Sequence, residues 1–124
     1  MTELIHKAES FKIIGVCMEV HRQLGKGNNE IIHKDALGYE FQRAGIPFAR
    51  EMEFSIQYKE IVLPHNYFAD FVVFGNILLE VKAVETLTDS HIKQVLNYLA
   101  ASRLRLGLLV NFGQDSLAYK RVVL

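Results

Sequence analysis

The spacing of apolar residues predicts two helices in the first third of the chain. Over residues 3–24, apolar positions recur at three- and four-residue steps, which is the period of one helix face. The members of this stripe are Leu4, Ala8, Phe11, Ile14, Met18 and His21. The segment Leu24-Gly25-Lys26-Gly27 ends the helix, because glycine adopts the left-handed backbone of a helix end without strain. Asn28 or Asn29 can cap a second helix that runs to about Ala44.

After the second helix the hydrophobic period changes to two, which is typical of half-buried strands. Residues 48–58 alternate apolar and polar side chains and predict the first strand. Lys59-Glu60 forms a turn into a second strand, interrupted near Pro64 and strongest over Tyr67–Val73. A third strand covers Ile77–Ala83.

The rest of the chain predicts one more helix and two more strands. Thr88 can cap a helix from Asp89 to about Ser102, with a buried stripe of Ile92, Val95, Leu96 and Leu99. The apolar run Leu104–Phe112 is typical of a fully buried strand, and Leu117–Leu124 predicts a short last strand.

The predicted order is therefore ααβββαββ. Three consecutive strands favour an antiparallel meander, and the helix before the fourth strand favours a crossover into a parallel neighbour. We expect one α/β domain over residues 1–124, with a mixed sheet flanked by helices, because this length is typical of a single core.

Composition is that of an ordinary globular chain, with 50% hydrophobic and 23% charged residues. No run of about 18 apolar residues occurs, and the first residues lack a signal-peptide core, so we expect a soluble cytoplasmic protein without a membrane span. Cys17 is the single cysteine and is expected to be a small core residue. The formal net charge is +0, which counts against strong non-specific binding of nucleic acid. A nucleic-acid partner would have to be held by a local patch, a metal ion or another protein.

Charged residues lie inside two strands that are otherwise apolar. Glu80 and Lys82 are two positions apart in the third strand, so they share one face of the sheet. Asp70 lies in the same way inside the second strand. Buried charges are costly unless they are paired or bind a metal, so these three residues need compensation.

The length of the hairpin loop between these strands decides whether Asp70 and Glu80 meet. A two-residue loop, Gly75-Asn76, would pair Asp70 with Val81 and place the two carboxylates on opposite faces. A three-residue loop that also includes Phe74 would place Asp70 opposite Glu80, with Cβ atoms roughly 4.5–5.5 Å apart. We predict the three-residue loop, because Asn76 tolerates the left-handed backbone that such loops need.

Two interpretations of this group remain open. In one, Lys82 simply neutralises Asp70 or Glu80 in an ion-pair cluster. In the other, the two carboxylates share a hard cation such as Mg²⁺, which prefers oxygen ligands, and Lys82 orients a water molecule or steadies a phosphate. Gln94 and Tyr98 form one stripe of the third predicted helix at i and i+4, either as the polar margin of that helix or as part of a site.

Several motifs resemble those of one nuclease superfamily. Asp70 followed by Glu80-Val81-Lys82 resembles the PD-(D/E)xK signature, with Ala69 in place of proline. Gln94–Tyr98 resembles the QxxxY motif of RecB-like and lambda-exonuclease-like members. Gly27–His33 resembles the signature of the small GxxExxY family, with His33 in place of tyrosine. The resemblance extends from about Ile14 to Leu124.

The resemblance implies a restriction-endonuclease-like fold and roles for six residues. Asp70 and Glu80 would be ligands of Mg²⁺ (or Mn²⁺), Lys82 the catalytic lysine, and Gln94 and Tyr98 would line the site. Glu30 would be a further acidic group from the second helix; its alternative role is favourable placement near a helix N-terminus.

The implied function is metal-dependent hydrolysis of the phosphodiester bonds of nucleic acid, DNA rather than RNA. The alternative is a catalytically silent module that binds nucleic acid or a protein partner. A homodimer that uses the strand edge Val122–Leu124 is a third hypothesis. His21 is expected to be a hydrogen-bonded core histidine, and His33 is a weaker candidate for a metal ligand beside Glu30.

Overall fold

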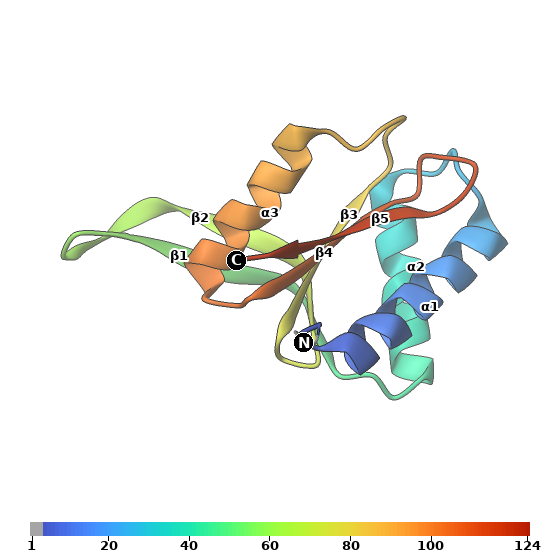
Figure 1. The fold of residues 1–124 in the computed structure, drawn as a ribbon, viewed down its shortest axis with the longest axis horizontal. Coiled ribbons are helices and arrows are strands. Elements are labelled where there is room, and N and C mark those ends of the chain that lie inside the picture. The colour runs from blue at the N-terminus through green and yellow to red at the C-terminus, as the bar shows by residue number, and fades with distance from the viewer. Residues whose placement is uncertain (1–3) are drawn as a thin grey trace.

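The computed structural model describes residues 4–124 and confirms the predicted order ααβββαββ (Figure 1). The helices are α1 (Lys7–Leu24), α2 (Glu30–Arg43) and α3 (Asp89–Ser102), and the strands are β1 (Phe48–Tyr58), β2 (Ile61–Val73), β3 (Ile77–Lys82), β4 (Leu106–Asn111) and β5 (Ala118–Val123). The strands form one sheet in the order β1-β2-β3-β4-β5. Every neighbouring pair is antiparallel except β3 and β4, which are parallel because α3 connects them.

The sheet separates two apolar clusters, one under each layer of helices. Ile77, Leu79 and Val81 of β3 pack in the cluster that contains the buried residues of α1 and α2. Leu78, which alternates with them, packs with Val95 of α3 on the other face. Because successive residues of a strand face opposite sides, Glu80 and Lys82 belong to the α3 face. The fold thus directs both charged side chains of β3 toward one helix.

The predicted apolar stripe of α1 was largely wrong. The helix begins at Lys7; of the predicted earlier positions, residue 3 lies outside the described residues. Phe11 is 81% exposed and Met18 is 49% exposed. The buried positions are Ser10, Ile13, Ile14, Cys17, Val20 and His21. The helix carries apolar residues on two sides, and its period alone does not say which side α2 and the sheet will cover.

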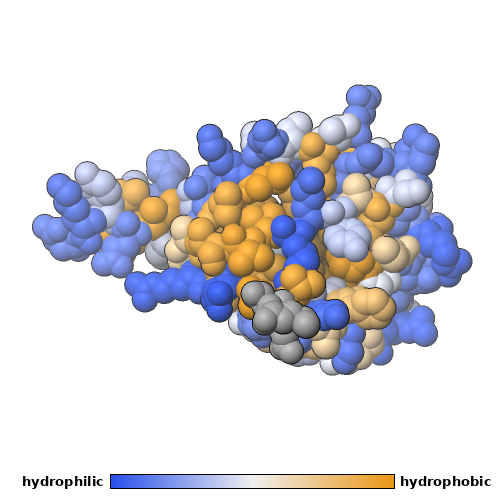
Figure 2. Space-filling view, viewed as in Figure 1, coloured by the Kyte–Doolittle hydropathy of each residue, from blue (hydrophilic) through white to orange (hydrophobic). Residues whose placement is uncertain are grey.

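The burial of Cys17 agrees with its predicted place in the core. The side chain is fully buried, and this burial raises the pKa of its thiol to about 12. The thiol is therefore protonated at neutral pH and is unreactive. Other apolar side chains stay on the surface: Val123 and Leu124, at the free edge of the sheet, are 51% and 57% exposed. Figure 2 shows apolar side chains gathered on the side of the molecule where β5 lies in Figure 1.

The outer parts of β1 and β2 form a two-stranded arm that extends beyond the rest of the sheet (Figure 1). β2 runs through Pro64 without the predicted interruption. The pairing of β1 with β2 shifts between Ser55 and Gln57, so the proline lies opposite an irregular part of the ladder. A proline is tolerated at such a place because no regular ladder hydrogen bond is lost there.

The hairpin between β2 and β3 has the predicted three-residue loop, because Val73 pairs with Ile77. The left-handed residues of this loop are Phe74, with φ 57°, and Gly75, with φ 72°, and not Asn76 as expected. α3 has its predicted bounds, and the backbone N–H of Thr88 donates to Nδ1 of His91 at 2.9 Å at its start. Within residues 4–124, no helix has the length and apolar character needed to cross a membrane.

Candidate active site

β2 and β3 separate at the position where Asp70 and Glu80 face each other. The regular pairing of the two strands ends with Phe71 opposite Leu79, so the continued register brings Asp70 opposite Glu80. Beyond this point β2 pairs only with β1, and β3 pairs only with β4. We call this point the fork. It places two carboxylates between strands that no longer bond each other.

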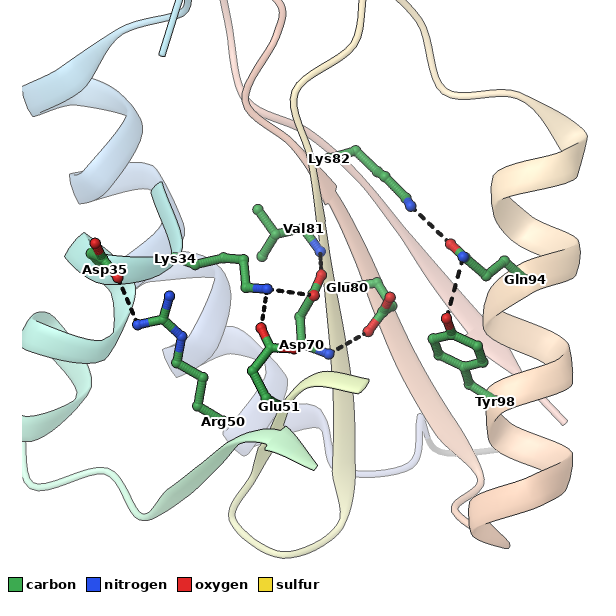
Figure 3. A network of polar contacts seen from close by, with 10 residues as sticks. All are labelled: Lys34, Asp35, Arg50, Glu51, Asp70, Glu80, Val81, Lys82, Gln94 and Tyr98. Atoms are coloured by element: carbon green, nitrogen blue, oxygen red, sulfur yellow. Dashed lines mark hydrogen bonds and ion pairs between the residues drawn. The ribbon is translucent and has the colours of Figure 1, made fainter. Parts of the chain in front are cut away.

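The two carboxylates take over the backbone hydrogen bonds that the strands lose at the fork (Figure 3). The N–H of Asp70 donates to Oε2 of Glu80 at 2.7 Å. The N–H of Val81 donates to Oδ2 of Asp70 at 2.8 Å. These bonds fix both side chains, because a buried backbone donor without a partner is costly. The carboxylates are therefore held in place by the same backbone that separates around them.

A lysine from α2 and a glutamate from β1 complete the group on one side. Nζ of Lys34 donates to Oδ1 of Asp70 at 2.9 Å and also to Oε1 of Glu51. The Lys34 side chain is 11% exposed and the Glu51 side chain 49% exposed. Glu51 has φ 53°, and the regular pairing of β1 with β2 passes over it. A left-handed backbone is uncommon for glutamate, and strain of this kind persists only where the surroundings enforce it.

Glu80 is the most deeply buried of these carboxyl groups. It is 3% exposed, and its pKa is raised to about 8 by burial and by the negative charge of Asp70. The hydrogen bond from Asp70 and the charges of Lys82 and Lys34 lower the pKa but do not outweigh the burial. Within residues 4–124, no lysine or arginine forms an ion pair with Glu80. The site therefore favours a proton or another cation at this carboxyl group.

For Lys34, burial lowers the pKa, but the hydrogen bonds with Glu51 and Asp70 outweigh this and raise it above its usual value. The ammonium is therefore charged at neutral pH. α2 is also tied to β1 by a second pair, in which Arg50 contacts Asp35 at 2.7 Å. These contacts hold the start of α2 against the fork (Figure 3).

Lys82 and the two predicted residues of α3 form a chain of hydrogen bonds on the other side of Glu80 (Figure 3). Nζ of Lys82 donates to Oε1 of Gln94 at 2.8 Å, and Nε2 of Gln94 donates to the hydroxyl of Tyr98 at 3.3 Å. The ring of Tyr98 packs against the ring of Tyr67 of β2, with centroids 4.7 Å apart. Burial raises the pKa of Tyr98, and the charges of Glu80 and Asp70 raise it further, so its hydroxyl stays protonated.

The structure thus brings five of the six predicted site residues together and leaves one apart. Asp70 and Glu80 are joined by a hydrogen bond at the fork, and Lys82, Gln94 and Tyr98 form a second hydrogen-bonded set beside Glu80. Glu30 is exposed at the first turn of α2. Within the described part of the chain it makes no hydrogen bond or ion pair with that group. The residue of α2 that reaches Asp70 is Lys34, one helical turn further on.

Sequence reasoning missed Lys34 and Glu51. For Lys34 a signal was present, because it lies on the same side of α2 as Leu37 and Phe41, which recur at three- and four-residue steps and are buried. A lysine on an apolar stripe needs a partner. For Glu51 the sequence carries no signal, since it occupies an ordinary polar position of an alternating strand.

The two histidines near the site are bonded to the backbone. His33 is fully buried; its Nε2 lies 3.1 Å from the carbonyl oxygen of Gly25 and its Nδ1 lies 3.3 Å from that of Asn29. Its ring stacks on Phe112, with centroids 4.4 Å apart. Both ring nitrogens of His33 therefore face backbone carbonyl oxygens inside the core. His21 bonds the carbonyl oxygen of Gln114 at 2.8 Å, as expected for a core histidine.

The chemistry of these side chains fits a hard divalent cation. Two carboxyl groups meet at the fork, and the buried one, Glu80, has no ion-pair partner among residues 4–124. Within residues 4–124, no cluster of three or more His, Cys, Asp or Glu side chains forms a complete metal site. Mg²⁺ does not need one, because it is commonly held by one or two carboxylates while water and substrate phosphate supply the other ligands.

A mixed sheet between helices, with paired carboxylates at a strand fork and a lysine two residues later, defines a restriction-endonuclease-like domain. A family model described as the PD-(D/E)XK nuclease superfamily matches residues 7–122. The chain therefore belongs to the PD-(D/E)XK nuclease superfamily, whose members typically use a divalent metal and act on nucleic acid.

The solved structure of SSO0001 agrees with the fold. The crystal structure of SSO0001 is similar to 98% of this chain and 78% of its own, with a TM-score of 0.55 and 16% identity. An alkaline exonuclease (LHK-Exo) from Laribacter hongkongensis is similar over 99% of this chain and 72% of its own, with a TM-score of 0.45 and 12% identity. No curated protein matches the chain significantly.

Proposed function

We propose that this protein is a metal-dependent nuclease that hydrolyses phosphodiester bonds of nucleic acid, DNA rather than RNA. The observation that carries the proposal is the fork, where Asp70 and Glu80 meet as oxygen donors beside Lys82. Family membership supports the reaction class. The proposal also places the chain in the GxxExxY family and in the branch with the QxxxY motif, on the residues Gly27–His33 and Gln94–Tyr98.

In this proposal Asp70 and Glu80 hold Mg²⁺ or Mn²⁺. When bound, such an ion lowers the pKa of a water molecule and stabilises negative charge on the phosphate. Glu80 has to lose its proton to act as a ligand, which its raised pKa makes costly until a cation arrives. Lys82 holds the attacking water or donates to the phosphate oxygens. Gln94 and Tyr98 keep the Lys82 ammonium on the α3 side of the site.

A cleavage assay with Mn²⁺ or Mg²⁺ tests the proposal on single-stranded DNA, double-stranded DNA and RNA. Asp70→Asn and Lys82→Ala should each lower the rate by about a hundredfold or more, because each removes a group that stabilises developing charge. Lys26→Ala is the matched control, since Lys26 pairs with exposed Asp115 away from the site. Cleavage that persists in Asp70→Asn, or in the presence of EDTA, would contradict the proposal.

A second candidate function is a nuclease-like module that binds nucleic acid or a protein without cutting. The observation in its favour is that both lysines are already occupied, Lys34 by carboxylates and Lys82 by Gln94. Within this second function, the formal net charge of +0 favours a protein partner over nucleic acid, because strong non-specific nucleic-acid binders carry a basic excess. Fluorescence anisotropy with labelled DNA at low salt, combined with the cleavage assay, separates the two. Binding without cleavage in Mn²⁺ would establish the second.

The proposal includes a homodimer, because two copies of a small domain would suit a substrate with two strands. β5 is an edge strand, and the exposed side chains of Val123 and Leu124 lie at this edge. The mass in solution by light scattering tests this. A mass of 14.2 kDa, that of one chain, would contradict it.

A further inference from the structure

We propose that Lys34 is a resident cation of the carboxylate cluster. Its ammonium holds Asp70 when no metal is present and has to leave Asp70 when a divalent ion binds. Lys34 therefore weakens the affinity of the site for the ion. This inference rests on the proposed metal site at Asp70 and Glu80.

The first argument is the place of the ammonium. Nζ of Lys34 lies 2.9 Å from Oδ1 of Asp70, while Oδ2 of Asp70 is used by the N–H of Val81. Each oxygen of Asp70 thus already accepts one hydrogen bond, and Oδ1 accepts it from the Lys34 ammonium. A divalent ion bound at Oδ1 would lie next to this ammonium in a largely buried site, where repulsion between like charges is strong.

The second argument is charge balance at the fork. Asp70 and Glu80 are two carboxyl groups in contact through the backbone, and Lys34 is the cation that forms an ion pair with one of them. Lys82, which faces the same side, donates to the neutral Gln94. In the metal-free protein the positive charge that stabilises the pair thus comes mainly from Lys34. A divalent ion would supply that charge in its place.

The third argument is that Lys34 has another partner. Its Nζ also contacts Glu51, whose side chain is 49% exposed and lies on β1, away from Glu80. The ammonium can leave Asp70 and keep its ion pair with Glu51, so its charge does not remain in the protein interior without a partner. Glu51 has a left-handed backbone, with φ 53°, and it is the β1 residue whose side chain contacts the Lys34 ammonium. Strain of this kind is typically found where a functional arrangement requires it.

Lys34→Met tests the inference, because methionine keeps a long side chain and removes the charge. Calorimetric titration of the metal-free full chain with MnCl₂ would compare wild type, Lys34→Met and the matched control Lys26→Met. Lys26 pairs with Asp115 at 2.7 Å on the surface. We expect Lys34→Met to lower the Kd for Mn²⁺ by about tenfold or more, the change produced by removing a competing unit charge. Lys26→Met should bind as wild type does.

The direction of the change distinguishes competition from a purely structural role. A lysine that only supports the site would, when removed, leave Mn²⁺ binding weaker or unchanged, and either result overturns the inference. Thermal melting adds a second readout. Lys34→Met should melt lower than wild type in EDTA and gain more than wild type from Mn²⁺. Lys34→Gln, which can still donate a hydrogen bond to Asp70, serves the same titration if the methionine variant does not fold.

Cleavage measured on the same variants separates this inference from the proposed function. Tighter Mn²⁺ binding by Lys34→Met without cleavage by any variant would support the role of Lys34 and contradict the nuclease proposal. Cleavage by wild type together with unchanged Mn²⁺ affinity in Lys34→Met would do the reverse. No Mn²⁺ binding by wild type and by both Lys34 variants would overturn the inference as well.

Discussion

The backbone N–H of Asp70 donates a 2.7 Å hydrogen bond to Oε2 of Glu80 across the fork between β2 and β3. The Glu80 side chain thus accepts a backbone hydrogen bond that the ladder between β2 and β3 no longer provides at Asp70. The bond also orients Glu80 while its carboxyl group is buried and beside a second carboxylate. In the proposed function, stability and metal binding therefore depend on the same two residues, and the charge of Glu80 affects both.

The first prediction concerns the pH dependence of stability without metal. The folded pKa of Glu80 is about 8, above its ordinary value of 4.5. Between these values the folded protein binds a proton that the unfolded chain does not, so stability falls as pH rises from about 5 to about 8. Glu80→Gln keeps an acceptor for Asp70 and removes the titration. It should stabilise the protein at pH 8, by at most a few kcal/mol, and have little effect near pH 5.

Urea unfolding at several pH values in EDTA measures this effect. Glu85→Gln is the control, because Glu85 is exposed in the loop after β3. Its stability should follow the wild-type pH dependence. If Glu80→Gln and wild type show parallel pH profiles, Glu80 does not carry a raised pKa. In a separate measurement, addition of Mn²⁺ should stabilise wild type but not Glu80→Gln, since an amide is a poorer ligand for a hard cation.

The second prediction concerns the contact between Lys82 and Gln94. Gln94→Leu removes the acceptor that lies 2.8 Å from the Lys82 ammonium, so Lys82 loses its fixed position. We expect cleavage to fall by about ten- to a hundredfold, with Mn²⁺ affinity unchanged, because positioning and not metal binding is lost. Gln94→Glu, which restores an acceptor for Lys82, should recover part of the rate. An undiminished rate in Gln94→Leu would mean that Gln94 does not position Lys82.

The third prediction separates a structural histidine from a metal ligand. His33→Leu removes both ring contacts, to the carbonyl oxygens of Gly25 and Asn29, in a fully buried position. The loss should destabilise the fold by about 1–3 kcal/mol, since the Gly25 carbonyl oxygen loses its contact with Nε2 and the ring no longer stacks on Phe112. Mn²⁺ affinity should not change. Urea unfolding and calorimetry measure the two quantities, with exposed His65→Gln as control. A loss of Mn²⁺ binding without a loss of stability would identify His33 as a ligand instead.

The fourth prediction concerns a glycine that packs against the segment after β3. A Cβ on Gly113 would lie 2.2 Å from the carbonyl oxygen of Val84, two residues after Lys82. Asn111 holds the same segment, because its side chain bonds both the N–H and the carbonyl oxygen of Val84. Gly113→Ala should therefore displace the end of β3 and destabilise the protein by about 1–3 kcal/mol.

Gly15→Ala is the matched control for Gly113→Ala. Gly15 lies within α1, and a Cβ there meets no other atom within 4 Å. This substitution should stabilise the protein by about 0.5–1 kcal/mol, because alanine loses less conformational freedom than glycine in a helix. Thermal melting compares both variants. Equal stability of Gly113→Ala and wild type would show that the Val84 segment can move without cost.

Local patterns were sufficient for the elements and for the register of the site. The bounds of α3 followed from Thr88 and the apolar period, and the bounds of β1 from the alternation of residues 48–58. The turn residues Gly75 and Asn76 predicted the three-residue hairpin loop, and the loop has that length, although Phe74 and Gly75 and not Asn76 adopt the left-handed backbone. These features were predictable because each depends on neighbours in the chain or on one hairpin.

The sequence by itself therefore determined the order of elements and the hairpin register that brings Asp70 opposite Glu80. Only the tertiary structure decided that Lys34 and not Glu30 reaches the fork, that Glu51 joins it, and that α1 buries Ile13 in place of Phe11. These outcomes depend on how helices rotate and dock against the sheet. A helix with two apolar sides, or with charges one turn apart, offers several orientations of similar local energy, and packing of distant residues selects one.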